Sequence, residues 1–227
     1  MRRMKKMKTF RFAGLVFLVS ILGISCSESG SNRYKTIKIG DQEWMAENLN
    51  NSRYRNGDKI PEAKTGEEWV AYGGEGTGAY CNFGNNVNNA ATYGRLYNWY
   101  AVNDPRGLAP QGWHTPTDAE WVTLTATLGG EEVAGAKMKS TSGWAEDDNG
   151  TNESGFSALP GGYRHSNGHF YHIGTATFWS STENPHYTDI HYRHPAWTRS
   201  LNDGNSEASR SGNDKQYGFS VRCVRDL

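Results

Sequence analysis

The stretch GLAPQGWHTPTDAEW, residues 107–121, carries the clearest structural signal in the chain because it runs into the start of a helix. Thr117 and Glu120 have the spacing of a capping box, in which the threonine hydroxyl accepts the third amide and the glutamate returns to the cap amide. Apolar side chains then recur at helical spacing, and two glycines predict where the helix ends. These residues are Trp121, Leu124 and Leu128, followed by Gly129 and Gly130.

The segments before this helix predict a hairpin, a long connection and another helix. Residues 35–45 alternate polar and apolar around Gly40-Asp41, which predicts a β-hairpin. Residues 50–90 are rich in Gly, Asn and Glu and predict an irregular connection with weak strand content. Residues 93–102 predict a helix, since bulky side chains recur at helical spacing. These are Tyr93, Leu96, Tyr97 and Tyr100.

The segments after the capping box predict one more short helix, over residues 131–139, and then strands. The expected strands are residues 161–165 and 169–173, joined by a turn at 166–168, and then 178–182, 197–201 and 218–224. Helices early and strands late, without regular alternation, predict an α+β fold with an antiparallel sheet.

The first 26 residues have the layout of a bacterial lipoprotein signal. Six basic residues precede an apolar run over residues 12–24, which is too short to span a bilayer of about 30 Å as a helix. We therefore expect cleavage of residues 1–25, lipid attachment at Cys26 and a flexible tether over residues 26–33. The expected location is the outer membrane or cell surface, and plain secretion is the alternative.

Cleavage would change both the charge and the cysteine count. The mature chain would hold 18 Lys and Arg against 24 Asp and Glu, a formal charge of −6, which argues against a nucleic-acid partner. Cys81 and Cys223 would be the only thiols left after lipidation. An exported compartment permits a disulfide between them, and two buried thiols are the alternative.

Five ordered blocks resemble one protein family. The similarity covers residues 34–227 and is to the Fibrobacter succinogenes major paralogous domain, found in exported proteins of Bacteroidetes and Fibrobacteres. The blocks are YGRLYNWYAV (93–102), GLAPQGWHTPTDAEW (107–121), GFSALPGGYR (155–164), FWSSTE (178–183) and GFSVRCVRD (218–226).

The resemblance implies a C-type lectin-like fold, with two helices beside small antiparallel sheets, long loops, and first and last strands close together. It also implies a distant similarity to formylglycine-generating enzymes, whose reactive cysteine pair has no match here. Ala109 stands where family members often have Cys, which leaves Cys81 and Cys223 to pair if the family topology brings them together. The core is then expected to contain Trp113, Trp121, Phe156, Phe178, Trp179 and Phe219.

Two groups of residues offer metal ligands. The loop over residues 147–153 carries Asp147, Asp148 and Glu153, whose oxygens are the ligands that calcium prefers, although it lacks EF-hand spacing and a solvated turn is the alternative. Several histidines lie near the turn at 166–168 and beyond it, but strand geometry turns neighbours to opposite sides, so packed or exposed imidazoles are favoured over zinc. They are His165, His169, His172, His186, His191 and His194.

Three functions follow as hypotheses. The first is a non-catalytic binding or adhesion module for a polysaccharide, because loop-rich stretches combine aromatic and polar side chains. Tyr171, Tyr187 and Trp197 are its expected stacking residues. The second is a structural component of a cell-surface protein assembly. The third and weakest is an enzyme resembling formylglycine-generating enzymes, because no catalytic arrangement or cofactor motif stands out.

Overall fold

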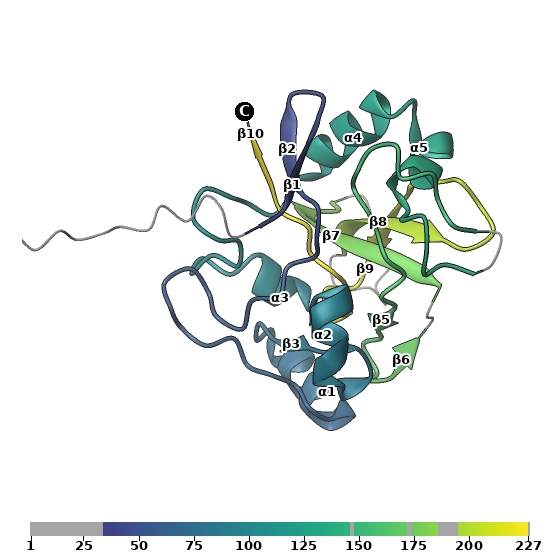
Figure 1. Cartoon of the computed structure of the whole chain (residues 1–227). Helices are drawn as coiled ribbons and strands as arrows, with labels where there is room; N and C mark the ends of the chain where they lie inside the picture. The colour runs from purple at the N-terminus through teal and green to yellow at the C-terminus, as the bar shows by residue number, and fades with distance from the viewer. Residues whose placement is uncertain (1–33, 146–147, 172–173, 186–194, 227) are drawn as a thin grey trace, which may run out of the picture.

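The computed structural model describes residues 34–145, 148–171, 174–185 and 195–226. Within these ranges, short helices and strands are joined by long loops, as Figure 1 shows. The helices are α1 (Gly66–Glu75), α2 (Val87–Tyr93), α3 (Trp99–Val102), α4 (Asp118–Thr127) and α5 (Glu131–Met138), with a 3-10 turn η2 at Phe83–Asn85. The strands are β1 (Thr36–Ile39), β2 (Gln42–Met45), β3 (Tyr80–Cys81), β4 (Leu96–Tyr97), β5 (Tyr163–Arg164), β6 (Phe170–Tyr171), β7 (Thr175–Glu183), β8 (Ala196–Asn202), β9 (Ser209–Asn213) and β10 (Val224–Asp226).

Every ladder between the strands of the described residues is antiparallel, and helices accompany them, which confirms the expected α+β class. Two sheets have three strands each, in the orders β1-β2-β10 and β7-β8-β9, and two pairs are β3-β4 and β5-β6. The first and last strands thus share a sheet, with Val224 opposite Trp44. In Figure 1 the end of β10 lies beside the β1–β2 hairpin.

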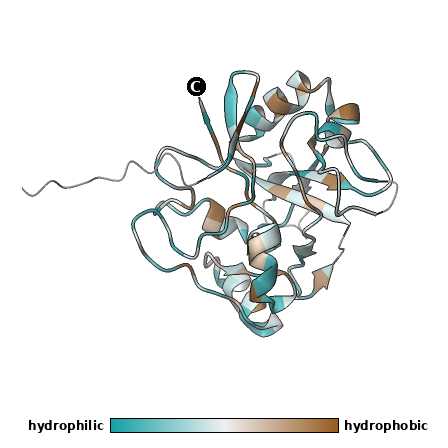
Figure 2. Cartoon of the chain, in the orientation of Figure 1, coloured by the Kyte–Doolittle hydropathy of each residue, from teal (hydrophilic) through white to brown (hydrophobic). Residues whose placement is uncertain are grey.

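The largest sheet packs one face against helices. Helices α4 and α5 contact β7, β8 and β9, and Trp121 of α4 packs 5.7 Å from Phe178 of β7, measured between ring centroids. Figure 2 shows that both helices carry hydrophobic as well as hydrophilic residues, as expected for helices with one buried face. The six aromatic residues expected in the core are all buried.

Helix α4 begins as its sequence predicts. The Thr117 side chain accepts a hydrogen bond from the Glu120 amide at 3.2 Å, and the Glu120 carboxylate accepts one from the Thr117 amide at 2.7 Å. Trp121 and Leu124 are fully buried beneath it. The short helix expected at 131–139 is also present, as α5.

The helix expected over residues 93–102 is wrong. Tyr93 ends α2, Leu96–Tyr97 forms β4, and Trp99–Val102 is a single turn of helix. Gly94 has φ +72°, and a Cβ there would lie 2.8 Å from the Leu49 carbonyl oxygen, so the chain turns where only glycine fits. Asn98 then accepts a hydrogen bond from the Ala101 amide at 3.1 Å and starts α3.

Residues 50–90 hold more helix than their composition predicts. Helix α1 has its own capping box, formed by Thr65 and Glu68, and it buries Trp69. Gly76 ends the helix in the left-handed region, at φ +69°. The expectation of an irregular connection is therefore wrong for this segment.

The expected strand at 218–224 is a buried thread rather than one ladder. Every residue from 218 to 224 is buried. Phe219 pairs with Tyr97, the Ser220 amide donates to the Thr177 carbonyl at 3.0 Å, and the Leu49 amide donates to the Val221 carbonyl at 2.8 Å. The thread thus joins three separate parts of the molecule before it becomes β10.

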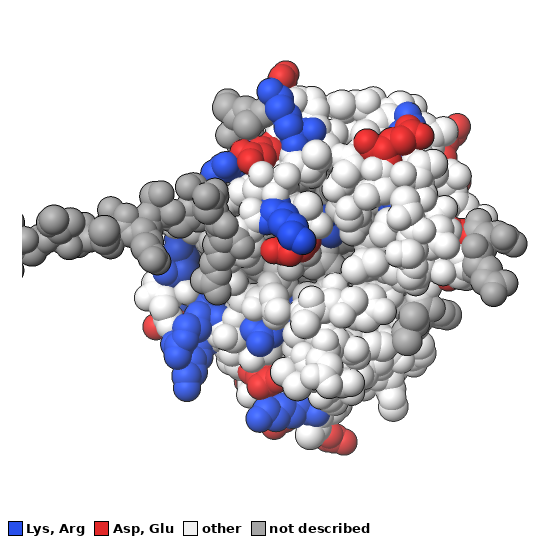
Figure 3. Space-filling model, in the orientation of Figure 1, with Lys and Arg blue, Asp and Glu red and all other residues white. Residues whose placement is uncertain are grey.

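Charges of both signs are interspersed over the face shown in Figure 3, without one large patch of either sign. No helix among the described residues has both the length and the apolar character needed to cross a membrane.

Candidate binding groove

The β7-β8-β9 sheet has two chemically different faces. Successive residues of a strand point to opposite sides. Ala176 and Phe178 of β7, with Leu201 of β8, are buried in the cluster that includes α4. The alternate residues face the other way and line a groove of about 640 Å³. Its floor, called the polar floor below, consists of Thr175, Thr177, Ser200, Asn202, Ser209, Ser211 and Asn213.

Hydrogen bonds between neighbouring strands position the polar floor. The Thr177 and Ser200 hydroxyl oxygens lie 3.0 Å apart, and the Thr175 hydroxyl donates to the Asn202 side-chain oxygen at 3.1 Å. On the outer strand, the Ser209 hydroxyl donates to Glu207 at 3.1 Å. A hydroxyl has one donor and two acceptor sites, so these groups retain capacity to bind a ligand.

Aromatic rings form one wall of the groove. Tyr163, Tyr217 and Phe219 line it, and their ring centroids lie 5.5–6.1 Å apart. Tyr171, which is 38% exposed, extends this aromatic wall by stacking on Tyr163 at 5.8 Å. Burial, and then the nearby Tyr171 phenol, raise the pKa of Tyr163, so its phenol stays uncharged at neutral pH.

A buried arginine holds the wall in place. Arg164 of β5 is fully buried, and its guanidinium donates to the backbone oxygens of Gly168 and Ala63, both at 3.0 Å. The same group lies over the Phe170 ring, 4.6 Å from its centroid. The Arg164 backbone also exchanges two hydrogen bonds with Gly218, which places Tyr163 beside the buried thread.

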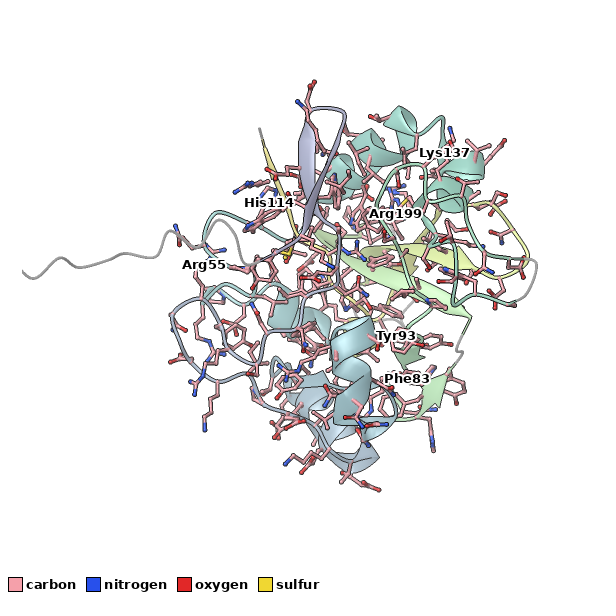
Figure 4. The ribbon with its side chains drawn as sticks, viewed as in Figure 1. Arg55, Phe83, Tyr93, His114, Lys137 and Arg199 are labelled. Atoms are coloured by element: carbon pink, nitrogen blue, oxygen red, sulfur yellow. The ribbon has the colours of Figure 1, made fainter. Side chains whose placement is uncertain are left out.

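The opposite face of the sheet holds a charged cluster that belongs to the packing. Arg199 of β8, labelled in Figure 4, donates to Asp118 at the start of α4, at 3.0 Å. Arg210 of β9 donates to both oxygens of the same carboxylate, at 3.0 and 2.6 Å. Burial would raise the pKa of Asp118, but the hydrogen bonds and charges of the two arginines hold it below its usual value.

Residues 37–225, from β1 to β10, match the family model described as the Fibrobacter succinogenes major domain. The match covers most of the chain and therefore shows the family. The chain belongs to this family. No curated protein and no solved structure matches it. In this Fibrobacter succinogenes major domain, the five family-like blocks fall on buried parts such as α4, Arg164 and the 218–224 thread. All seven residues of the polar floor lie outside these blocks.

Of the three residues expected to stack on a sugar in this Fibrobacter succinogenes major domain, only one is found at the groove among the described residues. Tyr171 belongs to the aromatic wall. Trp197 lies on the opposite face of the sheet from the groove, because it is an odd number of positions along β8 from the groove-lining Ser200 and Asn202. The Arg210 guanidinium covers its ring at 3.4 Å from the centroid. Tyr187 lies outside the described residues.

The expected calcium ligands of this Fibrobacter succinogenes major domain lie only partly within the described residues. Asp148 lines a small cavity of about 160 Å³ beside Lys139, whereas Glu153 is exposed, and Asp147 lies outside the described residues. His172, His186, His191 and His194 also lie outside them. Among the residues that are described, no three His, Cys, Asp or Glu side chains are grouped to hold a metal ion.

The expected disulfide is absent from this Fibrobacter succinogenes major domain, because Cys81 and Cys223 are both free, buried thiols. Cys81 packs with Trp69 and Leu96, whereas Cys223 belongs to a different cluster that contains Trp113. Burial raises the pKa of each thiol to about 12. The alternative of two buried thiols is therefore correct.

Sequence reasoning missed most of the groove in this Fibrobacter succinogenes major domain. Strand β9 reads Ser-Arg-Ser-Gly-Asn and has no apolar residue that would predict a strand. A signal was present in β7, where Thr175 and Thr177 alternate with Ala176 and Phe178. That period of two predicts one polar and one buried face for the sheet.

Proposed function

We propose that this domain is a non-catalytic carbohydrate-binding module carried by an exported lipoprotein, and that its ligand occupies the groove on the β7-β8-β9 sheet. The observation that carries the proposal is the combination of an aromatic wall with a floor of seven small polar side chains. Sugars present apolar C–H faces and rings of hydroxyls, which need both kinds of surface. The volume of about 640 Å³ lies within the range of small-molecule sites.

The proposed location rests on the amino-terminal sequence. Six basic residues, an apolar run and Ser25-Cys26 occur in the order that a lipoprotein signal requires. A lipid on Cys26 followed by a polar tether would place the domain at a membrane surface, where polysaccharides are accessible. Cys26→Ala should release the protein from membranes, and mass spectrometry should find no lipid on the released chain.

The non-catalytic part of the proposal rests on the thiols and the groove. An enzyme resembling the formylglycine-generating enzymes would need reactive cysteines, and burial with a raised pKa makes Cys81 and Cys223 poor nucleophiles. The lining of the groove offers hydroxyls and amides without a described carboxylate or histidine as a base.

We also propose that the architecture is C-type lectin-like. The pairing of β2 with β10, the helices beside the sheets and the long loops support this relationship. An experimental structure that superimposes on C-type lectin domains in the same strand order would test it.

A structural component of a surface assembly is the second candidate. A separate cleft of about 650 Å³ beside α1 favours it, since Val70, which is 43% exposed, and Phe170 both line this cleft. Exposed apolar side chains in a cleft are a feature of protein contacts as well as ligand sites.

A glycan array probed with the mature protein tests the proposed function. Tyr217→Ala and Asn202→Ala should each weaken binding to any retained glycan by at least about tenfold, which is ~1.4 kcal/mol. Trp197→Ala is the matched control, because it removes an aromatic ring from the opposite face of the same sheet. Circular dichroism should show all three variants folded.

Two results would contradict the proposal. Binding lost in Trp197→Ala but retained in Tyr217→Ala and Asn202→Ala would move the site to the other face. No retained glycan, combined with capture of a protein whose binding is lost in Val70→Asp, would favour the assembly component.

A further inference from the structure

The lining of the groove is chemically uniform in one respect. Every described residue that lines it is Ser, Thr, Asn, Tyr or Phe, so the described lining bears no formal charge. A bound carboxylate or sulfate group needs an Arg or Lys to compensate its lost hydration. The described lining offers only neutral donors and acceptors.

Three cations close to the groove in sequence have other partners. Arg210 lies between two floor residues on β9, but it points to the opposite face and binds Asp118. Lys215, just beyond the floor, lies 2.9 Å from Glu183 and over the Trp99 ring. Arg164, beside the wall, donates to backbone oxygens and is fully buried.

One carboxylate contacts the outer edge of the polar floor, where Glu207 accepts a hydrogen bond from the Ser209 hydroxyl at 3.1 Å. Charges within about 8 Å of a ligand act on it with little screening at physiological salt. The Glu207 carboxylate would repel an anionic ligand that binds near Ser209.

The floor is also wider than one sugar ring. Its residues come from three neighbouring strands, β7, β8 and β9. Strands lie about 4.8 Å apart, so the floor extends roughly 10 Å across the sheet. A ligand that contacts both the aromatic wall and the outer strand must therefore contain several linked sugars.

We propose that the groove selects neutral oligosaccharide or polysaccharide chains over anionic ones, and binds them through hydroxyl contacts and ring stacking without a bridging metal ion. This inference rests on the proposed carbohydrate-binding function and narrows its ligand class. Uronic-acid and sulfated polysaccharides are disfavoured because the described lining provides no cation and Glu207 stands beside Ser209 at the outer edge.

Affinity electrophoresis of the folded mature protein tests the inference. The neutral probes are β-glucan, xylan and galactomannan, and the anionic probes are polygalacturonate, alginate and heparin. At least one neutral polysaccharide should retard the protein, with equal retardation in EDTA and in high salt. The anionic polysaccharides should cause no retardation. Oligosaccharides of the retained neutral polymer should compete better as they lengthen.

A charge placed on the floor gives a second measurement. Ser211→Lys puts an ammonium group on an exposed floor residue, so it should reduce retardation by the neutral polymer and introduce retardation by polygalacturonate. Thr123→Lys adds the same charge to the exposed face of α4 and should change neither. Equal behaviour of the two variants would overturn the inference.

The failures of the two proposals are distinguishable. Retardation by an anionic polysaccharide that Tyr217→Ala abolishes would leave the groove as a sugar site but overturn the selection of neutral chains. Loss of neutral binding in EDTA would overturn the metal-free mode alone. No retardation by any of the six polysaccharides would overturn the carbohydrate-binding function itself, and the inference with it.

Discussion

At the scale of single residues, the two thiols show how burial controls chemistry. Cys81 and Cys223 are both fully shielded from solvent, and burial penalises their thiolate forms. A thiol that stays protonated neither attacks a carbonyl nor exchanges with a disulfide at neutral pH. The two residues therefore contribute as small apolar side chains.

The raised pKa of the two thiols should make the free energy of unfolding depend on pH in the alkaline range. Their pKa is raised from 9.0 to about 12, so between these values the unfolded chain loses thiol protons that the folded chain retains. The stabilisation is complete below pH 9 and is lost as the pH rises toward 12. Urea unfolding of the Cys81→Ala, Cys223→Ala double variant should show a smaller alkaline loss of stability than the wild-type protein.

The same samples test the absence of a disulfide. In the native wild-type protein, both thiols should resist alkylation, and both should react once urea unfolds it without any reductant. A native mass lighter than that of the dithiol form by two hydrogen atoms would show a disulfide and contradict the structure.

At the scale of elements, helix α4 begins at a capping box that the sequence predicts and buries one face in the core. Its capping box is formed by neighbouring residues, and its buried face places Trp121 4.8 Å from Trp44, between ring centroids. Phe156 and Phe178 complete this aromatic cluster. The helix thus supports the sheet from the face opposite the groove.

Removal of the Trp121 ring should unfold or severely weaken the domain. Truncation of a buried tryptophan to alanine costs on the order of 3–5 kcal/mol, a large part of the stability of a typical domain. Val122→Ala, at a neighbouring position that is 45% exposed, should change the free energy of unfolding by about 0.5 kcal/mol or less. Thermal melting followed by circular dichroism measures both, and equal melting temperatures would contradict this role.

Local signals explain which elements could be predicted. The α4 helix and the β1–β2 hairpin depend on caps and turns a few residues long, so their sequences suffice. Helix α1 has an equally local capping box, but Gly73 and Gly74 dilute its helical character. Strand β9 depends on its neighbour β8 rather than on its own residues, so the polar floor could not be predicted beyond the alternation in β7.

At the scale of the whole molecule, one buried arginine joins distant parts of the chain. Arg222 donates to the backbone oxygens of Met45 and Phe156 and makes two hydrogen bonds to the Asn48 side-chain oxygen, at 3.0 and 2.6 Å. Burial lowers its pKa to about 9, which still leaves the guanidinium charged at neutral pH. Its planar fork matches several acceptors at once, which a lysine cannot do.

Arg222→Met and Arg222→Lys should therefore both destabilise the domain strongly. The methionine variant leaves buried oxygens without donors, at about 1–3 kcal/mol for each group, so a total loss on the order of 3 kcal/mol or more is expected. Arg225→Met is the control, because Arg225 is part-exposed and pairs with Glu43, and a surface pair contributes about 1 kcal/mol or less. Similar urea midpoints for the Arg222 and Arg225 variants would contradict this role.

The position of the buried thread has a consequence for biosynthesis. Residues 218–224 contact β2, β4 and β7, yet they leave the ribosome after all of these partners. The sheets and core clusters therefore cannot be completed until residues 218–224 have been synthesised. Contacts between residues so distant along the chain also form slowly. If the proposed export route requires an unfolded chain, this delay favours export, because the domain stays incompletely folded until its last segment has been made.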